Sequence, residues 1–204
     1  MKKRAFVGLD VHKRSIAVAV AVDARGGEVR FLGNIVHEPD ALAKLAQKLA
    51  ATHGALEFCY EAGPCGYGLY RQLLAQGFAC MVVAPSRIPM AAGDRVKTDR
   101  RDAQRLAVLH RAGELTAVWV PDATHEAMRD LVRARLDAML HLMRARQQLL
   151  AFLLRHGRVY EAGRKPWTGR HRRWLSAQSF QEPAQNIVFQ DFAPADELLL
   201  FRQK

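Results

Sequence analysis

The chain has 204 residues, 50% of them hydrophobic, and its 31 lysines and arginines against 20 acids give a formal net charge of +11. No apolar run approaches the roughly 20 residues of a membrane span, and the three cysteines lack the spacing of a zinc site or a disulfide framework. We therefore expect a cytoplasmic, folded protein without membrane association, whose positive charge suits a polyanion such as nucleic acid.

Three short runs rich in Val, Ile and Phe open the chain, at residues 5–11, 15–22 and 28–36. The first two are separated by His12-Lys13-Arg14, and the second and third by a segment that contains Asp23 and two glycines. Short β-branched runs with turn residues between them are typical of antiparallel strands. This pattern predicts a three-stranded β-meander.

Helices and strands alternate after the meander. Pro39 opens a helical pattern with leucines at 42, 45 and 49, and it is followed by a strand at 56–62, a helix at 66–75 and a strand at 78–84. Strands that pair in parallel need a crossover between them. The order βββαβαβ therefore predicts an α/β fold, with a mixed sheet and helices on its faces.

The pattern changes after Pro85, where a polar, basic and glycine-bearing loop is expected to lead into a helix from about Thr98 to Ala112. Residues 115–120 form a short closing segment. After Pro121 a helical pattern runs to about Arg155 without a Gly or Pro inside it, which predicts one long helix.

The long helix carries an apolar seam at alternating spacings of four and three, with Arg146 in one position of the series. Its apolar members are Val132, Leu136, Met139, Met143, Leu150 and Leu153. A polar residue within such a seam can set the register or the number of partners in a coiled coil. The same pattern also fits an amphipathic helix that packs on its own domain, and the sequence leaves both readings open.

Residues 155–174 combine many cations with aromatic side chains, among them Tyr160, Trp167 and Trp174. Cations neutralise phosphates and aromatic faces stack on unpaired bases, so this composition suits nucleic acid, although a solvated basic loop would look similar. After Pro183 an apolar-acidic run predicts a return helix that is interrupted at Pro194.

Four carboxylates fall where this fold would gather them. Asp10 lies inside the first apolar run, where an unpaired buried charge costs several kcal/mol, and Glu61 ends the fourth strand. Asp99 and Asp102 share one face of a helix start. Two Mg²⁺ ions about 4 Å apart among such acids can support phosphoryl transfer. Taken alone, Asp99 and Asp102 could form a capping box and Glu61 could cap a turn.

Three segments carry a resemblance to a known family: GLDVHK around Asp10, YEAGPCGYGLYRQL around Glu61, and VVAPSRIPMAAGDRVKTDRRDAQRLA around Asp99 and Asp102. Together they closely resemble the DEDD-type transposases of bacterial insertion sequences, a family that also includes DNA invertases and bridge-RNA-guided recombinases. The resemblance covers roughly residues 5–120, and the long helix and the RHRRWL segment continue it to about Ala184.

The resemblance implies an RNase-H-like fold of the Holliday-junction-resolvase type. It assigns residues 1–120 to a catalytic domain, 121–157 to a coiled-coil-like helix, and 158–204 to a basic aromatic connection and the start of a return helix. It also implies that Asp10, Glu61, Asp99 and Asp102 are the catalytic acids and bind Mg²⁺, with Mn²⁺ as the alternative ion. The implied partners are DNA, a structured guide RNA and further copies of the chain, as a dimer or tetramer.

Basic and aromatic side chains near the acids and after the long helix are the expected nucleic-acid contacts. They are Lys13, Lys97, Arg100, Arg101, Arg105, Arg158, Arg164, Lys165, Trp167, Arg170, Arg172, Arg173 and Trp174. The resemblance further implies a C-terminal domain with a serine that attacks DNA, so we expect residues 1–204 alone to be inactive in strand transfer. Two alternatives are a resolvase-like metal-dependent nuclease and a non-catalytic nucleic-acid-binding module.

Overall fold

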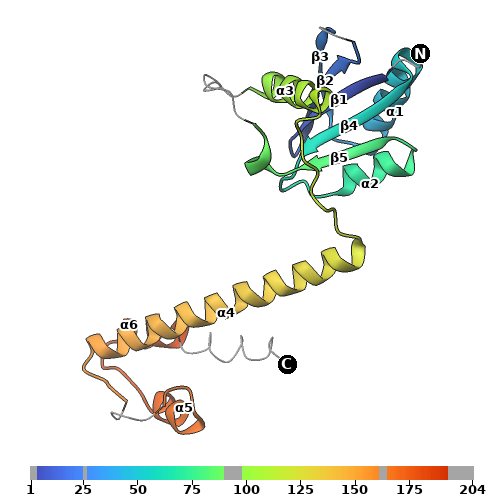
Figure 1. The fold of residues 1–204 in the computed structure, drawn as a ribbon. Helices are drawn as coiled ribbons and strands as arrows, with labels where there is room; N and C mark the ends of the chain where they lie inside the picture. The colour runs from blue at the N-terminus through green and yellow to red at the C-terminus, as the bar shows by residue number, and fades with distance from the viewer. Residues whose placement is uncertain (1–3, 25–26, 90–97, 161–164, 193–204) are drawn as a thin grey trace. The chain divides into compact units, whose positions relative to one another are not determined.

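The computed structural model describes residues 4–24, 27–89, 98–160 and 165–192 of the chain. It divides into two compact units, residues 1–120 and residues 121–204. The first unit contains a five-stranded sheet, and the second contains a long helix with two shorter ones (Figure 1). Among the described residues, no helix combines the length and apolarity that crossing a bilayer requires.

The sheet has the strand order β3-β2-β1-β4-β5. Its strands are β1 (Arg4–Val11), β2 (Ser15–Val22), β3 (Val29–Val36), β4 (Ala55–Glu61) and β5 (Ala79–Val83). β1, β2 and β3 pair antiparallel, whereas β4 is parallel to β1 and β5 is parallel to β4. This order and these directions are those of an RNase-H-like sheet, so the predicted mixed sheet and its fold class are confirmed.

Helices cover both faces of the sheet (Figure 1). Helices α1 (Pro39–His53) and α2 (Gly68–Ala75) pack on one face, where Leu42 and Leu73 join Val7, Leu9 and Val18 in the main core. Helix α3 (Asp99–Ala112) covers the opposite face. Successive strand residues point to opposite faces, so along β2 Ile16, Val18 and Val20 join the main core while Ala17, Ala19 and Ala21 face α3.

The sheet face beneath α3 carries Gly8 of β1 and the alanines of β2 where the helix approaches it, and Phe6 lies in the same cluster. Ala17 and Ala19 of β2 pack with Ala103 and Ala107 of α3 in one buried cluster. A Cβ atom placed on Gly8 of β1 would lie only 2.3 Å from the carbonyl oxygen of Ala103 and 2.5 Å from the backbone nitrogen of Ala107. Glycine at this position is what allows the backbone of α3 to approach β1.

Two short connections complete the first unit. Pro85–Arg87 form a single 3₁₀ turn, η1, after β5. The closing segment expected at residues 115–120 pairs with the sheet through one isolated antiparallel bridge between Ala117 and Val83.

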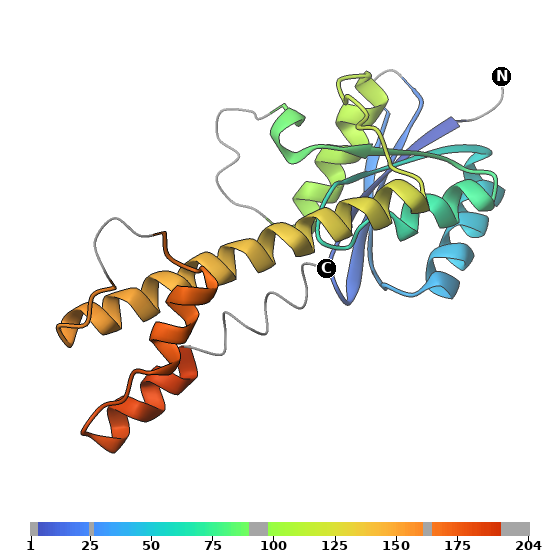
Figure 2. The same ribbon diagram turned by 90° about the horizontal axis from the view of Figure 1, so that it is seen from below.

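The second unit is organised by α4 (Ala123–Arg155), which begins at an N-cap where Asp122 accepts a hydrogen bond from the backbone of His125. Helices α5 (Gly169–Ser176) and α6 (Pro183–Phe192) lie beside the C-terminal part of α4 (Figure 2). Together the three helices bury a small core of Leu149, Phe152, Leu153, Leu175, Phe180 and Phe189. The predicted long helix is confirmed, and α6 matches the expected return helix up to Phe192.

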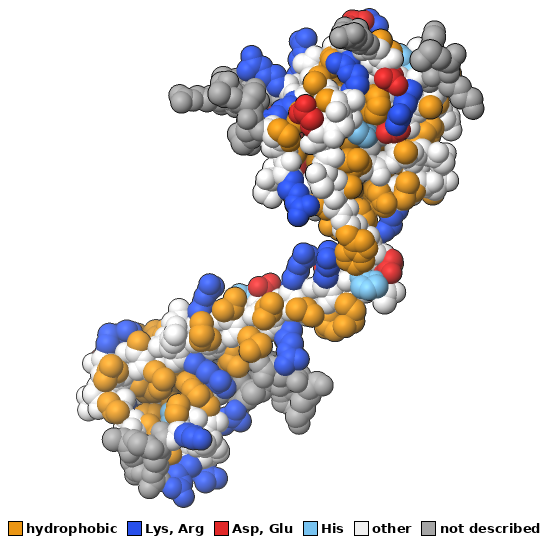
Figure 3. Space-filling model, viewed as in Figure 1, with side chains coloured by type: hydrophobic (Ala, Val, Ile, Leu, Met, Phe, Trp, Pro, Cys, Tyr) orange, Lys and Arg blue, Asp and Glu red, His pale blue; other side chains and the backbone are white. Residues whose placement is uncertain are grey.

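Most of the predicted seam of α4 is exposed within this unit. Val132, Leu136, Met139 and Met143 are between 48% and 54% exposed, whereas Leu153 is buried in the small core. Figure 3 shows hydrophobic side chains along one side of the long helix. The C-terminal end of the seam thus packs on its own unit, and the coiled-coil reading of the remainder stays a prediction.

Residues 169–176, which lie within the expected basic aromatic connection, form the short helix α5, which the sequence analysis did not predict. His171, Trp174 and Leu175 fall on one helical face and pack inward, with the rings of His171 and Trp174 stacked at 5.6 Å. Thr168 caps the helix by accepting a hydrogen bond from the backbone of His171 at 3.3 Å. The high density of arginines masked this short amphipathic pattern in the sequence.

Candidate active site

Asp10 lies near the end of β1 on the face that α3 covers. Phe6, Gly8 and Asp10 alternate with Val7 and Leu9, and the latter two belong to the core on the opposite face. The side chain of Asp10 is 19% exposed. The alternation of the strand therefore directs a carboxylate, otherwise out of place in an apolar run, toward the start of α3.

The start of α3 supplies two more carboxylates. Thr98 is its N-cap, whose hydroxyl accepts a hydrogen bond from the backbone nitrogen of Arg101 at 3.4 Å, and Asp99 and Asp102 lie in the first turn. The helix runs antiparallel to β1, because Ala103 approaches Gly8 whereas His110 packs on Phe6 farther back along the strand. The N-terminal turn of α3 consequently reaches the end of β1 that carries Asp10.

Glu61 ends β4, the strand parallel to β1. Leu9 pairs with Tyr60, so Asp10 and Glu61 each follow directly after a paired residue at the same edge of the sheet. On the α3 side of β4, the thiol of Cys59 donates to the carbonyl of Leu106 at 3.5 Å, and Glu61 follows Cys59 by one strand period. The first and fourth strands are therefore neighbours, which brings the ends carrying Asp10 and Glu61 to the same edge.

The four predicted acids line one cavity of about 830 Å³. Asp10 comes from β1, Glu61 from β4, and Asp99 and Asp102 from α3. Lys13, which the sequence analysis assigned to nucleic-acid contacts, lines the same cavity. The fold thus brings together residues that lie up to 92 positions apart along the sequence.

The tightest contacts in the cavity involve a residue that the sequence analysis treated as part of a turn. The Nε2 atom of His12 lies 3.0 Å from Oδ2 of Asp10 and 3.5 Å from Oδ1 of Asp99. One ligand atom from each of these three residues lies within 4.8 Å of the other two. Glu61 and Asp102 line the cavity outside this group. The missed signal was the two-residue spacing of Asp10 and His12 at a strand end.

The electrostatics of Asp10 match a site for a divalent cation. Burial raises the pKa of the Asp10 carboxyl above its usual value, the carboxylates of Asp102 and Asp99 raise it further, and His12 acts in the opposite direction. Ionising Asp10 in this setting is unfavourable without a compensating positive charge. Oxygen ligands gathered around one cavity are the donor set that Mg²⁺ and Mn²⁺ take, so these residues fit such an ion.

The predicted basic residues of the first unit differ in what they contact. Arg100 and Arg101 are exposed in the first turn of α3, and the Arg100 guanidinium lies 5.6 Å from the ring centre of Phe31. Arg105 donates to the carbonyl of Pro89 and so ties α3 to the segment after η1. Lys97 lies outside the described residues.

Some of the predicted nucleic-acid contacts of the second unit take part in its internal packing. Arg158 donates to Oε1 of Gln178 at 3.0 Å and lies 4.2 Å from the ring centre of Phe180. Trp167 and Trp174 are half-buried against the small core. These contacts stabilise the unit and reduce the aromatic surface that could stack on bases.

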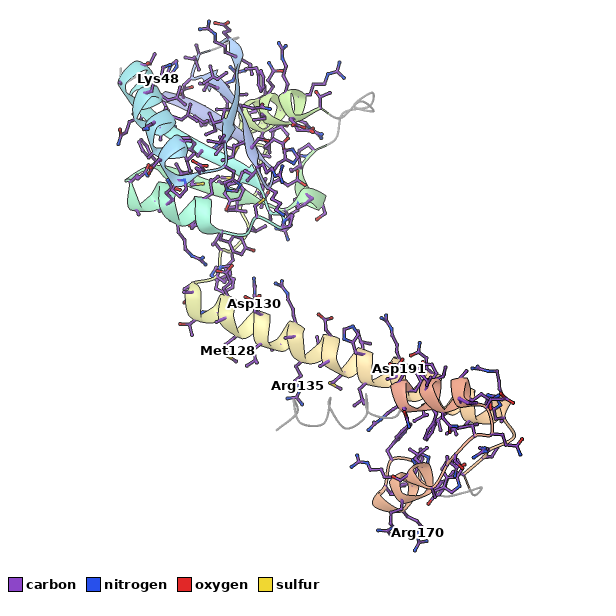
Figure 4. The ribbon with its side chains drawn as sticks, turned by 180° about the vertical axis from the view of Figure 1, so that it is seen from behind. Lys48, Met128, Asp130, Arg135, Arg170 and Asp191 are labelled. Carbon is purple, nitrogen blue, oxygen red and sulfur yellow. The ribbon has the colours of Figure 1, made fainter. Side chains whose placement is uncertain are left out.

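Other predicted cations of the second unit are available at the surface. Lys165, Arg170 and Arg173 are exposed, and Arg170 projects away from α5 (Figure 4). Arg172 is half-buried, and Arg164 lies outside the described residues. The exposed subset is the part of the basic segment that can contact phosphates without unfolding the unit.

Two curated transposases are similar in sequence to this chain. The chain is 53% identical over 189 residues to the transposase-family protein y4qE of Sinorhizobium fredii, a match that covers 93% of this chain and 48% of that protein. It is 36% identical over 193 residues to the transposase for insertion sequence element IS1533 of Leptospira borgpetersenii, covering 94% of this chain and 56% of that one. The chain thus spans about half the length of these curated relatives.

A solved structure and a family model also match the chain. The structure of RuvC from Thermus thermophilus aligns with 56% of this chain and 99% of its own, at 11% identity and a TM-score of 0.36. Residues 7–157, most of the chain, match a family described as transposases, the DEDD transposases of the IS110 type. The chain belongs to this family of insertion-sequence transposases.

Proposed function

We propose that this chain provides the metal-dependent catalytic domain of a DNA transposase and acts in phosphoryl transfer on DNA. The observation that carries the proposal is the convergence of Asp10, Glu61, Asp99 and Asp102 on one cavity of a chain with a net charge of +11. A strongly basic protein attracts the DNA backbone, and an acidic pocket within it would repel phosphates unless cations intervene.

The four acids would hold Mg²⁺, or Mn²⁺ as the alternative. When bound, such an ion polarises a phosphoryl oxygen and stabilises the charge that develops during displacement. Asp10 and Glu61 present carboxylates from neighbouring parallel strands, and α3 adds Asp99 and Asp102 from one helical turn. Lys13, which lines the same cavity, is placed to neutralise a phosphate that enters it.

The second unit would hold nucleic acid and a further copy of the chain. Its exposed cations Lys165, Arg170 and Arg173 suit phosphate contacts with DNA or with a structured guide RNA. The exposed seam of α4 suits a dimer or tetramer, because burying apolar side chains at about 25 cal/mol per Å² favours association. These partners rest on the family resemblance and on the exposed surfaces together.

We propose that strand transfer additionally requires a serine on a domain beyond residue 204. The four acids alone would hold metal and position a phosphate. The family resemblance assigns the attack on DNA to that serine. Labelled DNA incubated with residues 1–204 should therefore yield no protein–DNA adduct on a denaturing gel, and an adduct should appear when the further domain is supplied. An adduct formed by these residues alone would refute this assignment.

The binding part of the proposal is tested by measuring the affinity for labelled DNA as a function of salt. Each lost phosphate contact should lower the log–log slope by about 0.9, so Arg170→Gln together with Arg173→Gln should lower it by about 1.8. Arg135→Gln is the matched control, because Arg135 is an exposed arginine of α4 outside the predicted contact set (Figure 4). Equal slopes for all variants would remove α5 from the interface.

The catalytic part is tested with the same DNA and Glu61→Gln. This variant keeps the positive surface, so its DNA affinity without metal should be at least that of the wild type, while its response to Mg²⁺ should be lost. Mg²⁺-dependent cleavage of the DNA by the wild-type chain without an adduct would instead support the resolvase-like nuclease. A chain whose DNA binding ignores both Mg²⁺ and Glu61→Gln would be a non-catalytic binding module.

A further inference from the structure

We propose that His12 is a direct ligand of one divalent cation, together with Asp10 and Asp99, and that its nitrogen biases the site toward Mn²⁺ over Mg²⁺. This inference rests on the proposed metal site and adds a residue and an ion preference to it. The geometry is that one imidazole nitrogen, Nε2, faces both carboxylates, at 3.0 Å from Asp10 and 3.5 Å from Asp99.

The spacing of these three atoms suits ligands of a common ion. Neighbouring ligands of a six-coordinate ion with bonds of about 2.1 Å are separated by about 3.0 Å. The separation between Nε2 of His12 and Oδ2 of Asp10 equals that value, and all three ligand atoms lie within 4.8 Å of one another. The side chains therefore need little movement to surround an ion. Because Nε2 of His12 and Oδ2 of Asp10 also lie at hydrogen-bond distance, Nε2 must be the unprotonated ring nitrogen when the ion binds.

The ion preference follows from the donor atoms. Mg²⁺ is a hard ion that takes oxygen ligands, whereas first-row transition ions accept imidazole nitrogen more readily. Two carboxylates and one neutral imidazole give the group a charge that balances a divalent cation. Glu61 and Asp102, which line the cavity outside this group, supply oxygen donors alone and would suit a second ion of either kind.

His12 can be removed without damaging the fold. Its side chain is 51% exposed, and the hydrogen bond between its backbone nitrogen and the carbonyl of Ser15 does not depend on the ring. His12→Ala therefore creates no buried cavity. His37→Ala is the matched control, because His37 lines the same cavity but its Nδ1 atom contacts the backbone oxygen of His12, at 2.8 Å.

The test uses Mn²⁺ alone, added to the full chain and examined by pulsed electron paramagnetic resonance for a ¹⁴N coupling from a bound imidazole. The coupling should be present in the wild type and in His37→Ala and absent in His12→Ala. Calorimetric titration should show that His12→Ala weakens Mn²⁺ binding about tenfold or more and Mg²⁺ binding by a smaller factor. Asp10→Asn should weaken the binding of both ions, which locates them in the cavity.

The outcomes separate this inference from the proposed function. Mn²⁺ binding that depends on Asp10 but shows no ¹⁴N coupling, or keeps it in His12→Ala, would overturn the role of His12 and leave the carboxylate site standing. Loss of the coupling in His37→Ala but not in His12→Ala would identify His37 as the ligand. This result would likewise overturn the proposed role of His12. A wild-type chain that binds neither ion would overturn both proposals.

Discussion

Gly8→Ala should displace α3 and disrupt the candidate site, although Gly8 is not one of its ligands. The added Cβ would lie 2.3 Å from the oxygen of Ala103 and 2.5 Å from the nitrogen of Ala107, both of them backbone atoms. The helix must retreat by roughly 1 Å to restore ordinary contacts. Overpacking of this kind should lower the free energy of unfolding of the first unit by about 2 to 3 kcal/mol.

Hydrogen-exchange mass spectrometry measures this change separately in the two units. A loss of about 2 to 3 kcal/mol corresponds to roughly 30- to 160-fold faster exchange for amides of β1 and β2 that exchange through global opening. Peptides from α5 should keep their protection and serve as an internal reference. Affinity for Mn²⁺ should also fall, because a shift of roughly 1 Å in Asp99 and Asp102 exceeds the tolerance of a preorganised site.

Gly68→Ala is the matched control for this prediction. A Cβ atom on Gly68, the first residue of α2, would meet no atom within 4 Å, so the variant should be neutral or stabilised by up to about 1 kcal/mol. If the amides of β1 exchanged as slowly in Gly8→Ala as in the wild type, the inference that Gly8 permits the close approach of α3 would be refuted. Rescue of Gly8→Ala by Ala103→Gly would also refute it, because trimming a side chain cannot relieve a clash with backbone atoms.

Three further predictions concern charge and assembly. Asp10→Asn should stabilise the metal-free chain at neutral pH, since folding raises the pKa of that carboxyl, and calorimetry should show that Mg²⁺ raises the melting temperature of the wild type and not of the variant. Burial lowers the pKa of His110 below its ordinary value of 6.5, so urea unfolding should show stability lost as the pH falls from 6.5 toward the lowered pKa, and His110→Phe should reduce that loss. Leu136→Asp together with Leu150→Asp should give monomers by sedimentation, and a wild type already monomeric at tens of micromolar would exclude the seam as an assembly surface.

The sequence by itself determined the elements of the sheet. Alternating valines and alanines in SIAVAVAV favour a strand with one large and one small face, and the turn residues indicate where each strand of the meander ends. The long helix was equally readable, because 33 residues without a helix breaker leave few alternatives. Local propensity and periodicity suffice for such features.

The candidate acids were also identifiable in the sequence, from an unexpected Asp10 in an apolar run and from a paired Asp99 and Asp102 at a helix start. Their convergence at one edge of the sheet was expected from the strand order, whereas the distances inside the cavity depend on the parallel pairing of β1 with β4 and on the close approach of α3 at Gly8. His12 was missed for the same reason. Its partner Asp99 lies 87 positions away in the sequence, and only the packed helix brings that carboxylate to the imidazole.

In the second unit the sequence indicated the composition of a segment but not the burial of its side chains. Composition identified a basic, aromatic segment but could not separate side chains that face solvent from those that pack inward. Tertiary contacts place Trp167 and Trp174 against the small core and leave Arg170 and Arg173 at the surface. The physical reason is that burial depends on which distant apolar groups a helix face meets, here Phe152 and Phe189 of α4 and α6, and spacing along one segment does not contain that information.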